Sequence, residues 1–426
     1  MQMIEEYRKI QLTKAIMMPW IVCFAASLFF FYEFIQGNMF ASIADNIMYD
    51  FHIQADKMTY LSSIYYASNV IFLFVAGFLL DRFSSKKIIL LAMLLCVLST
   101  FVLAHAESFY LALGCRFMTG IGSAFCFLGP IRIASRWFPP KRMALVTGAI
   151  VTMAMTGGML AQYPLTQLVL HVGWRSALTM VAWLGSAMLL LMMVWVKDKP
   201  DNTPDAVIAK TGVLIRAKAA YFNAQTLRAA LYTSLMNMAV AVFGAMMGSL
   251  YLMERLDVGK ADAAMVNSML FLGAIIGGPV IGWCSDKLGL RVLPMKAGTV
   301  ASFMVLIGIL YLPVTLSLMA VLFFLLGFFT ASQVISYAFV AESCSSTMTA
   351  TALSLISIMT QGGYIVYQNL FSTLLTSQGH ARIVDGVPVY LLADYQTATL
   401  ILPLGLSLAL FIILGLKETH CRHVGG

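Results

Sequence analysis

Two oppositely charged residues lie inside long apolar stretches of this 426-residue sequence. Glu33 belongs to an apolar run from about Pro19 to Ala41, and Arg116 belongs to one that begins near Phe109. A charged side chain inside a membrane is costly, and it persists where it faces a polar cavity or a counter-charge. At about 1.5 Å per residue, both lie roughly 10 to 12 Å from the same side of the membrane. We therefore expect Glu33 and Arg116 to be level with one another and able to form an ion pair.

An acid and an arginine at this depth suggest proton-coupled movement of a solute. Arg116 would alternate between Glu33 and a carboxylate of the solute, and Glu33 would take up a proton when it loses its partner in a low-dielectric site. One alternative is a static ion bridge that fixes helix packing. A second alternative is that the two side chains do not touch.

Polar and aromatic residues in the middle of other apolar runs indicate the walls of a solute path. Gln361, Tyr364 and Gln368 share one helix face, as residues that line a path should. Amide and hydroxyl groups in membranes also bond neighbouring helices, so we expect about half of the set to reach a solute. Glu342, at the end of another run, is interpreted as a solvated helix end. The full set is Tyr65, Tyr66, Asn69, Gln162, Asn237, Gln333, Tyr337, Gln361, Tyr364 and Gln368.

The cysteines and histidines do not form a metal-binding pattern. The seven cysteines have no CxxC spacing and lie mostly in apolar runs, and the six histidines fall at predicted loops, span edges or the tail. We therefore expect no metal and no cofactor. The sequence also lacks a phosphate-binding glycine loop and a nucleophile elbow, so an enzyme is not expected.

Composition indicates that most of the chain lies in a lipid bilayer. It is 60% hydrophobic and 11% charged, and long apolar runs recur from end to end. A spanning helix needs about 20 such residues, so the predicted fold class is all-α, a polytopic membrane protein. Twelve transmembrane helices are expected, at about 19–41, 58–80, 87–105, 109–134, 143–169, 174–196, 227–252, 262–282, 293–313, 316–341, 347–375 and 395–416.

Lysine and arginine concentrate on one side of these spans if both termini share a side. The positive-inside rule makes that side cytoplasmic, together with both termini. The basic loops account for the net charge of +8, so we expect no binding to nucleic acid.

The loop after the second span recurs after the eighth span. Its first copy contains Gly77, Asp81, Arg82, Lys86 and Lys87, and its second contains Gly282, Asp286, Lys287, Gly289 and Arg291. The repeat predicts two six-helix halves, at 1–196 and 227–426, with a cytoplasmic linker at 197–226. We expect each first glycine to let two helices approach closely. Each aspartate should cap a helix end and pair with a basic residue across the loop.

These features resemble the major facilitator superfamily over the whole chain. Its loop motif is Gly-x-x-x-Asp-(Arg/Lys)-x-Gly-(Arg/Lys)-(Arg/Lys), which the first copy meets except at Ser84 and Ser85. The segment from Arg116 through Gly120 to Gly122 resembles the family's Arg-x-x-x-Gly-x-Gly motif. The resemblance implies two pseudo-symmetric six-helix bundles that bind a solute between them and transport it by alternating access.

Below that level, the chain is similar to bacterial phagosomal nutrient transporters and, more distantly, to lysosomal dipeptide transporters. This similarity implies amino acids or short peptides as solutes, and pairing at Arg116 extends the expectation to organic anions. We expect a proton-coupled monomer in a bacterial inner membrane. The alternatives are a drug or organic-cation exporter of the same fold and, less favoured, a membrane receptor that transports nothing.

Overall fold

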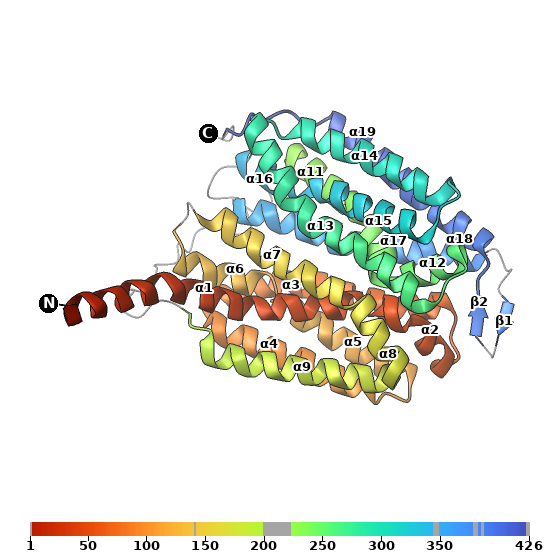
Figure 1. Cartoon of the computed structure of the whole chain (residues 1–426), viewed down its shortest axis with the longest axis horizontal. Helices are drawn as coiled ribbons and strands as arrows, with labels where there is room; N and C mark the ends of the chain where they lie inside the picture. Colours follow the sequence, from red (N-terminus) through yellow and green to blue (C-terminus); the bar gives the residue numbers. More distant parts are fainter. Residues whose placement is uncertain are drawn as a thin grey trace.

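The computed structural model describes residues 2–139, 142–198, 223–343, 349–377, 382–384 and 387–422, with side chains for these residues except 2–16, 74, 78, 81, 144, 349–351, 382–384 and 387–389. Nearly all described residues are helical, and the long helices run side by side (Figure 1). Helices satisfy all backbone hydrogen bonds within one segment, as a bilayer requires. The all-α fold class is confirmed.

The first half of the chain forms one group of helices, shown from red to yellow-green in Figure 1. In chain order they are α1 (Gln2–Asn38), α2 (Phe40–Phe51), α3 (Ala55–Arg82), α4 (Ser85–Ala104), α5 (Phe109–Ser123), α6 (Leu128–Trp137), α7 (Met143–Leu160), α8 (Tyr163–Val172) and α9 (Trp174–Trp195).

The second half forms the other group, shown from green to blue. It contains α11 (Ala224–Met236), the π-helix η2 (Val240–Met247), α12 (Gly248–Leu256), α13 (Lys260–Leu288), α14 (Val292–Tyr311), α15 (Leu316–Thr330), the 3₁₀ turn η3 (Ala331–Val334), α16 (Ile335–Ser343), α17 (Thr349–Ser377), α18 (Leu392–Thr399) and α19 (Ile401–Leu414).

Helices occupy all twelve predicted intervals. In the part of the chain that the structure describes, nine helices are long and apolar enough to cross a membrane, and a bent pair, Ala224–Met236 with Val240–Leu256, makes a tenth. Helices α3 and α17, with 28 and 29 residues, fill the remaining two intervals. At about 1.5 Å per residue they are long enough to cross a bilayer.

Several spans are broken, which the apolar runs do not predict. The first span ends as α1 at Asn38 and continues as α2 beyond its predicted end. The seventh bends by 41° between α11 and η2. Hydropathy depends on residue types and not on backbone hydrogen bonds, so it predicts each span as one unbroken helix.

A short hairpin also lies in what we expected to be a loop. Strands β1 (Arg382–Val384) and β2 (Val387–Val389) pair antiparallel, with Ile383 opposite Pro388. The hairpin lies between α17 and α18.

Both ends of the described chain lie at the left of Figure 1. We call this end of the molecule the terminal side and the opposite end, where α2, α8 and the hairpin lie, the far side. An even number of spans brings both ends to one side.

The two halves meet along two seams, where α3 packs against α17 and α7 packs against α13. Polar contacts between the halves lie toward the far side. Lys260 donates to Asp45 at 2.6 Å, and the Ala55 amide donates to the Tyr390 hydroxyl at 3.2 Å. The molecule is therefore closed at its far side.

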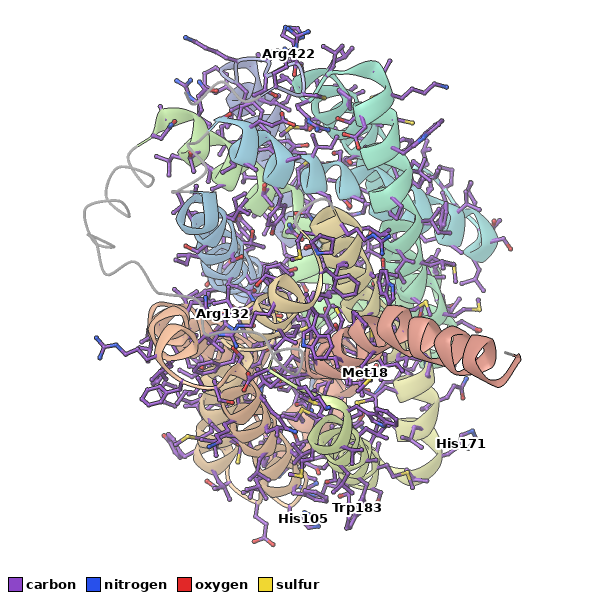
Figure 2. All side chains as sticks on the ribbon, turned by 90° about the vertical axis from the view of Figure 1, so that its left-hand side faces the viewer. Met18, His105, Arg132, His171, Trp183 and Arg422 are labelled. Carbon is purple, nitrogen blue, oxygen red and sulfur yellow. The ribbon has the colours of Figure 1, made fainter. Side chains whose placement is uncertain are left out.

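Apolar side chains cover the outer surface. Figure 2 views the molecule from the terminal side and places Trp183 at the outer edge of the first half, where its side chain is 64% exposed. Arg132 lies instead where the first half borders the second. The exposed tryptophan is suited to face lipid.

Candidate functional site

Helix α5 fits closely between α3 and α4 because two of its residues lack a side chain. A Cβ atom at Gly120 would lie 2.2 Å from the Tyr65 carbonyl oxygen on α3, and one at Gly122 would lie 2.8 Å from the Ala92 carbonyl oxygen on α4. Only glycine permits such approaches. The Arg-x-x-x-Gly-x-Gly pattern thus places Arg116, about one turn before Gly120, beside Tyr65.

The guanidinium of Arg116 is fully buried and is bound by backbone carbonyls. Nε donates to the Leu61 carbonyl at 3.2 Å, and Nη1 donates to the Gln36 carbonyl at 3.1 Å. The group also lies 4.7 Å from the centre of the Phe40 ring and 4.5 Å from that of Tyr65, a cation–π arrangement. Nη2 has no hydrogen-bond partner among the described residues.

One of these carbonyls belongs to the end of α1. Because α1 ends at Asn38, its last carbonyls lack partners within the helix. Arg116 binds the Gln36 carbonyl, and the Tyr66 hydroxyl donates to the Gly37 carbonyl at 3.0 Å. A helix carboxyl end carries partial negative charge, so it stabilises a buried cation. This explains how an arginine is accommodated here without a carboxylate.

Glu33 is 1% exposed and does not pair with Arg116 in this structure. Its Oε2 accepts a hydrogen bond from the Tyr65 hydroxyl at 3.1 Å, while Oε1 has no partner among the described residues. Tyr65 therefore lies between the Glu33 carboxyl group and the Arg116 guanidinium, with its hydroxyl on Glu33 and its ring against Arg116. The expected ion pair is absent because the backbone at the end of α1 already binds the arginine.

Tyr66 meets another residue of the predicted set across the two halves. Its ring centre lies 4.8 Å from that of Tyr364 on α17, with the rings steeply inclined. Asn69 points elsewhere, because its side-chain amide donates to the Ser123 hydroxyl at 2.7 Å within the first half. The structure thus brings Tyr66 and Tyr364 together, whereas the Asn69 side chain bonds to α5.

The amides of Asn237 and Gln333 bond to each other. Gln333 Nε2 donates to Asn237 Oδ1 at 3.0 Å, and Asn237 Nδ2 donates back to Gln333 Oε1. Tyr337 lies one turn beyond Gln333 and is partly exposed, as is Gln361 on α17. Gln361 makes no hydrogen bond to a described residue.

Gln162 and Gln368 are fully buried and bond to the backbone of η2. Gln162 Nε2 donates to the Gly244 carbonyl at 2.8 Å, and Gln368 Nε2 donates to the Ala241 carbonyl at 3.0 Å. In this arrangement both side chains connect helices, and no surface of either is open to a solute.

Comparison with known proteins now identifies the family. The sequence model of the Major Facilitator Superfamily matches residues 22–243 and 229–420, which together span both halves. The chain belongs to the Major Facilitator Superfamily. The resemblance drawn from the loop motif and from the motif at Arg116 is confirmed.

Curated relatives of this superfamily member are distant. The uncharacterized MFS-type transporter YceJ of Bacillus subtilis is 25% identical over 397 residues, which are 87% of this chain and 95% of the relative. The probable sulfoacetate transporter SauU of Cupriavidus necator is 26% identical over 128 residues, 30% of each chain. The hexuronate transporter of Bacillus subtilis is 23% identical over 171 residues, 40% of each chain. The chain thus matches less than half the length of the last two.

Solved structures share the fold. A bacterial homolog of the human lysosomal transporter Spinster, in an inward-facing and occupied conformation, superposes with a TM-score of 0.71 at 16% identity, covering 92% of this chain and 95% of that one. The nucleoside transporter NupG superposes with a TM-score of 0.71 at 14% identity, covering 92% and 99%. At such identity the likeness concerns the fold alone.

The second copy of the superfamily loop motif lies in a cluster of charges on the terminal side. Arg291 donates to Asp286 at 2.6 Å and to Glu342 at 2.7 Å, and Glu418 accepts the backbone N–H groups of Arg291 and Val292 at 2.7 and 2.8 Å. The interpretation of Glu342 as a solvated helix end is wrong, because its partner comes from a loop distant in sequence.

Hydrogen bonding keeps this cluster charged. Burial favours the neutral form of Arg291, but hydrogen bonds to Glu342 and Asp286 prevail and raise the pKa of Arg291 above its usual value. Burial also opposes ionisation of Glu418, yet backbone N–H groups, led by those of Arg291 and Val292, lower the pKa of the Glu418 carboxyl.

The first copy of the motif is organised by Asp198, which follows α9. Asp198 accepts the Lys86 backbone N–H at 2.8 Å and the Ser84 hydroxyl. Ser84, which stands where the family has glycine, also accepts the Lys87 N–H at 3.2 Å and so caps α4. The side chain of Asp81 lies outside the described residues. Arg82, the last residue of α3, is exposed.

The two copies differ at the family's glycine position. Gly289 has φ +65° and ends α13 in the left-handed conformation that favours glycine, whereas Ser84 has φ −57°. The serine is therefore tolerated in the first copy. Lys287 lies 5.0 Å from the centre of the Trp283 ring.

The close helix approach expected at the first glycine of each copy is absent. A Cβ atom at Gly77 or Gly282 would meet nothing within 4 Å. The physical reason is that the halves contact each other toward the far side, so the terminal ends of α3 and α13 lack a close neighbour at these positions.

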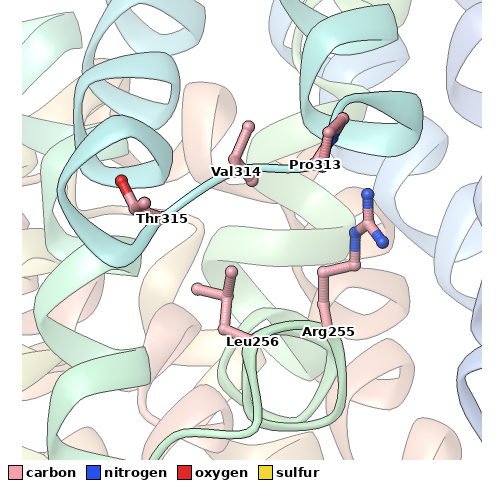
Figure 3. A pocket seen from close by; sticks show the side chains of 5 residues that line it. All are labelled: Arg255, Leu256, Pro313, Val314 and Thr315. Atoms are coloured by element: carbon pink, nitrogen blue, oxygen red, sulfur yellow. The ribbon is translucent and has the colours of Figure 1, made fainter.

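A shallow pocket opens at the far-side end of the second half (Figure 3). It is lined by Arg255, Leu256, Pro313, Val314 and Thr315. None of the predicted site residues lines this pocket. The Arg255 guanidinium donates to the Leu312 carbonyl at 2.9 Å, so it fastens the loop between α14 and α15.

Proposed function

We propose that this protein is a proton-coupled secondary transporter of small organic anions. One observation carries the proposal: Glu33 is 1% exposed within a span and has no cationic partner among the described residues. An isolated carboxylate is too costly in such a place, so Glu33 is neutral here and holds a proton.

Arg116 offers a partner for Glu33 once that proton leaves. Both groups contact Tyr65, and Arg116 Nη2 has no described partner. Pairing with the new carboxylate would draw the guanidinium away from the Gln36 and Leu61 carbonyls. Loss of the proton from Glu33 would therefore loosen the end of α1. In this way a change of protonation would become a change in backbone structure.

The same arginine favours an anionic solute. With Glu33 neutral, Arg116 contributes one uncompensated positive charge to the first half, and a charge in a low-dielectric interior acts over a long range. The names of two relatives, which give sulfoacetate and hexuronate, support this class of solute. Amino acids and short peptides carry a carboxylate as well and belong in the same test.

The closed far side supports a direction for the cycle. If the basic terminal side is cytoplasmic, a state that is closed at the far side and protonated at Glu33 is one that has brought a proton inward. In a symport cycle, solute and proton would leave this state together to the cytoplasm, and the protein would import its solute.

Uptake into liposomes tests the proton role. Purified wild type and Glu33→Gln would be reconstituted, and accumulation of radiolabelled glucuronate, sulfoacetate and dialanine would be followed under an inward proton gradient. We expect wild type to accumulate an anion and Glu33→Gln to lose accumulation at least tenfold while it still exchanges labelled for unlabelled solute. Glu107→Gln, at an exposed carboxyl in the loop before α5, should behave as wild type.

Accumulation by Glu33→Gln at the wild-type level would refute the proton role. The assay should include ethidium, because the alternative exporter of the same fold would move a hydrophobic cation instead. Movement of ethidium together with no transport of glucuronate, sulfoacetate or dialanine would favour that alternative.

A further inference from the structure

The seventh span contains a buried π-helix. In η2 the backbone bonds run to the fifth residue back, which is rare and is found frequently at functional sites. All eight of its residues are buried, and the span bends by 41° just before it. Wider turns leave carbonyls accessible to outside donors, so the neighbours of η2 decide whether this geometry is stable.

Three amide side chains from outside η2 bind its carbonyls. Gln368 on α17 donates to the Ala241 carbonyl at 3.0 Å, and Asn267 on α13 donates to the Phe243 carbonyl at 2.9 Å. Gln162 donates to the Gly244 carbonyl at 2.8 Å. We call these side chains the amide clamp. The first two belong to the same half as η2.

Gln162 alone of the amide clamp comes from the opposite half. It lies at the break between α7 and α8, and its Oε1 accepts a second bond across the seam, from Asn267 Nδ2 at 2.7 Å. Both polar atoms of its amide are therefore used between the halves, and the residue is fully buried.

The backbone that presents Gln162 is itself anchored in the first half. The Ser42 hydroxyl on α2 contacts the carbonyls of Ala161 and Gln162 at 2.6 and 3.1 Å, and it accepts the Thr166 hydroxyl at 2.7 Å. A rigid first half thus places one amide against η2, which packs against α2 as well. Separation of the halves at the far side has to break both bonds of this amide.

We propose that Gln162 is the positioning residue of the far-side gate: by bonding Gly244 and Asn267 it favours the π-helical form of η2 and closes the far side. The proposal rests on the alternating-access part of the proposed function, not on its solute or proton. When the far side opens, η2 loses the Gln162 bond and is free to return to ordinary helical bonding.

Distance measurements between spin labels test this without a solute. Labels at Glu107→Cys and Leu312→Cys, exposed far-side positions in opposite halves, would report opening in the full-length protein with native cysteines removed. A second pair at Lys87→Cys and Lys287→Cys would report the terminal side. Gln162→Leu should raise the ratio of far-side-open to far-side-closed molecules about tenfold, because two buried hydrogen bonds are lost.

A matched control separates gating from general loss of an amide. Gln361→Leu removes the same group from a partly exposed site with no described hydrogen bond, and it should leave both distances unchanged. Gln162→Asn, which keeps the amide but is one methylene shorter, should give a smaller shift and serves if Gln162→Leu does not fold.

A wild-type far-side distance distribution in both Gln162 variants would overturn the proposal. A shift equal to that of Gln361→Leu would overturn it as well. Failure of this proposal can be distinguished from failure of the proposed function. The first is measured by distances between spin labels, and these do not depend on whether the wild type takes up an anion.

Discussion

Single residues show what sequence patterns can and cannot predict in this protein. Charge is rare in apolar runs, so Glu33 and Arg116 could be singled out, and their common depth could be estimated. Their partners could not be predicted. Arg116 binds the carbonyls of Gln36 and Leu61, and every residue offers a carbonyl, so no pattern of residue types reveals the contact. Glu342 was misjudged for a related reason, since Arg291 is distant in sequence.

Gly120 is the residue on which the placement of Arg116 depends most directly. A Cβ atom there would lie 1.9 Å from the Ser68 hydroxyl and 2.2 Å from the Tyr65 carbonyl. We expect Gly120→Ala to force α5 away from α3 and to destabilise the protein by about 2 kcal/mol, as overpacking does. Thermal unfolding in detergent would measure the loss.

Gly114→Ala supplies the matched control on the same helix, because a Cβ atom at Gly114 would meet nothing within 4 Å. Its melting temperature should equal or slightly exceed that of wild type. Equal melting temperatures for Gly120→Ala and Gly114→Ala would contradict the close contact between α3 and α5.

The positions of the helices were predicted well, but their breaks and bends were not predicted. Apolar runs gave twelve intervals, all of them helical, because hydropathy measures which residues prefer lipid. The breaks in the first and seventh spans were missed, since they depend on outside donors such as the Tyr66 hydroxyl at Gly37 and the amide clamp at η2. Their donors lie far away in the sequence.

One arrangement occurs in both halves and was not predicted: a carboxylate from the end of a half binds the backbone at the start of a helix. Asp198, after α9, accepts the Lys86 N–H and the Ser84 hydroxyl at the start of α4. Glu418, after α19, accepts the N–H groups of Arg291 and Val292 at the start of α14. Each carboxylate lies at a helix amino end, where negative charge is favourable. The repeat of this arrangement agrees with the repeat of the loop motif.

The lowered pKa of Glu418 makes this arrangement sensitive to acid. A carboxyl whose pKa is lower in the folded state stabilises that state above its ordinary pKa of about 4.3, and the contribution is lost as pH falls through the lower folded value. We expect Glu418→Gln to melt about 1 to 2 °C below wild type at pH 7, the size of a lost helix cap. The difference should vanish toward pH 3.

Differential scanning fluorimetry of detergent-solubilised protein from pH 7 to pH 3 would measure both curves. Glu107→Gln, at an exposed carboxyl, should follow wild type throughout. A Glu418→Gln deficit that persists unchanged at pH 3 would mean that the charge plays no part.

At the scale of the whole molecule, the contacts that close the far side could not be predicted from the sequence. The repeat of the loop motif indicated two bundles, and an even number of spans put both termini on one side. Which side is closed depends on contacts between residues that lie more than a hundred positions apart. Lys260 with Asp45 and Asn46 is such a contact.

Lys260 should keep the far side shut, because its side chain is 9% exposed and its ammonium contacts both oxygens of Asp45. We expect Lys260→Ala to increase the labelling rate of a buried cysteine at Thr59→Cys about threefold to tenfold, the range for an ion pair worth up to about 1 kcal/mol and slightly more when buried. A charged maleimide added to purified protein would measure the rate.

A charge exchange, Asp45→Lys with Lys260→Glu, should restore slow labelling at Thr59→Cys. An exposed site, Tyr49→Cys, should react at one rate in every variant. If Lys260→Ala and wild type protect Thr59→Cys equally, the ion pair does not contribute to closing the far side.

The attachment of Arg116 to main-chain oxygens has a practical consequence for mutagenesis. Truncating the side chains of Gln36 or Leu61 leaves those oxygens in place, so an alanine scan would not reveal that either residue binds Arg116. Only a change that reroutes the polypeptide itself, such as a proline near residue 36, would expose how much this anchor matters.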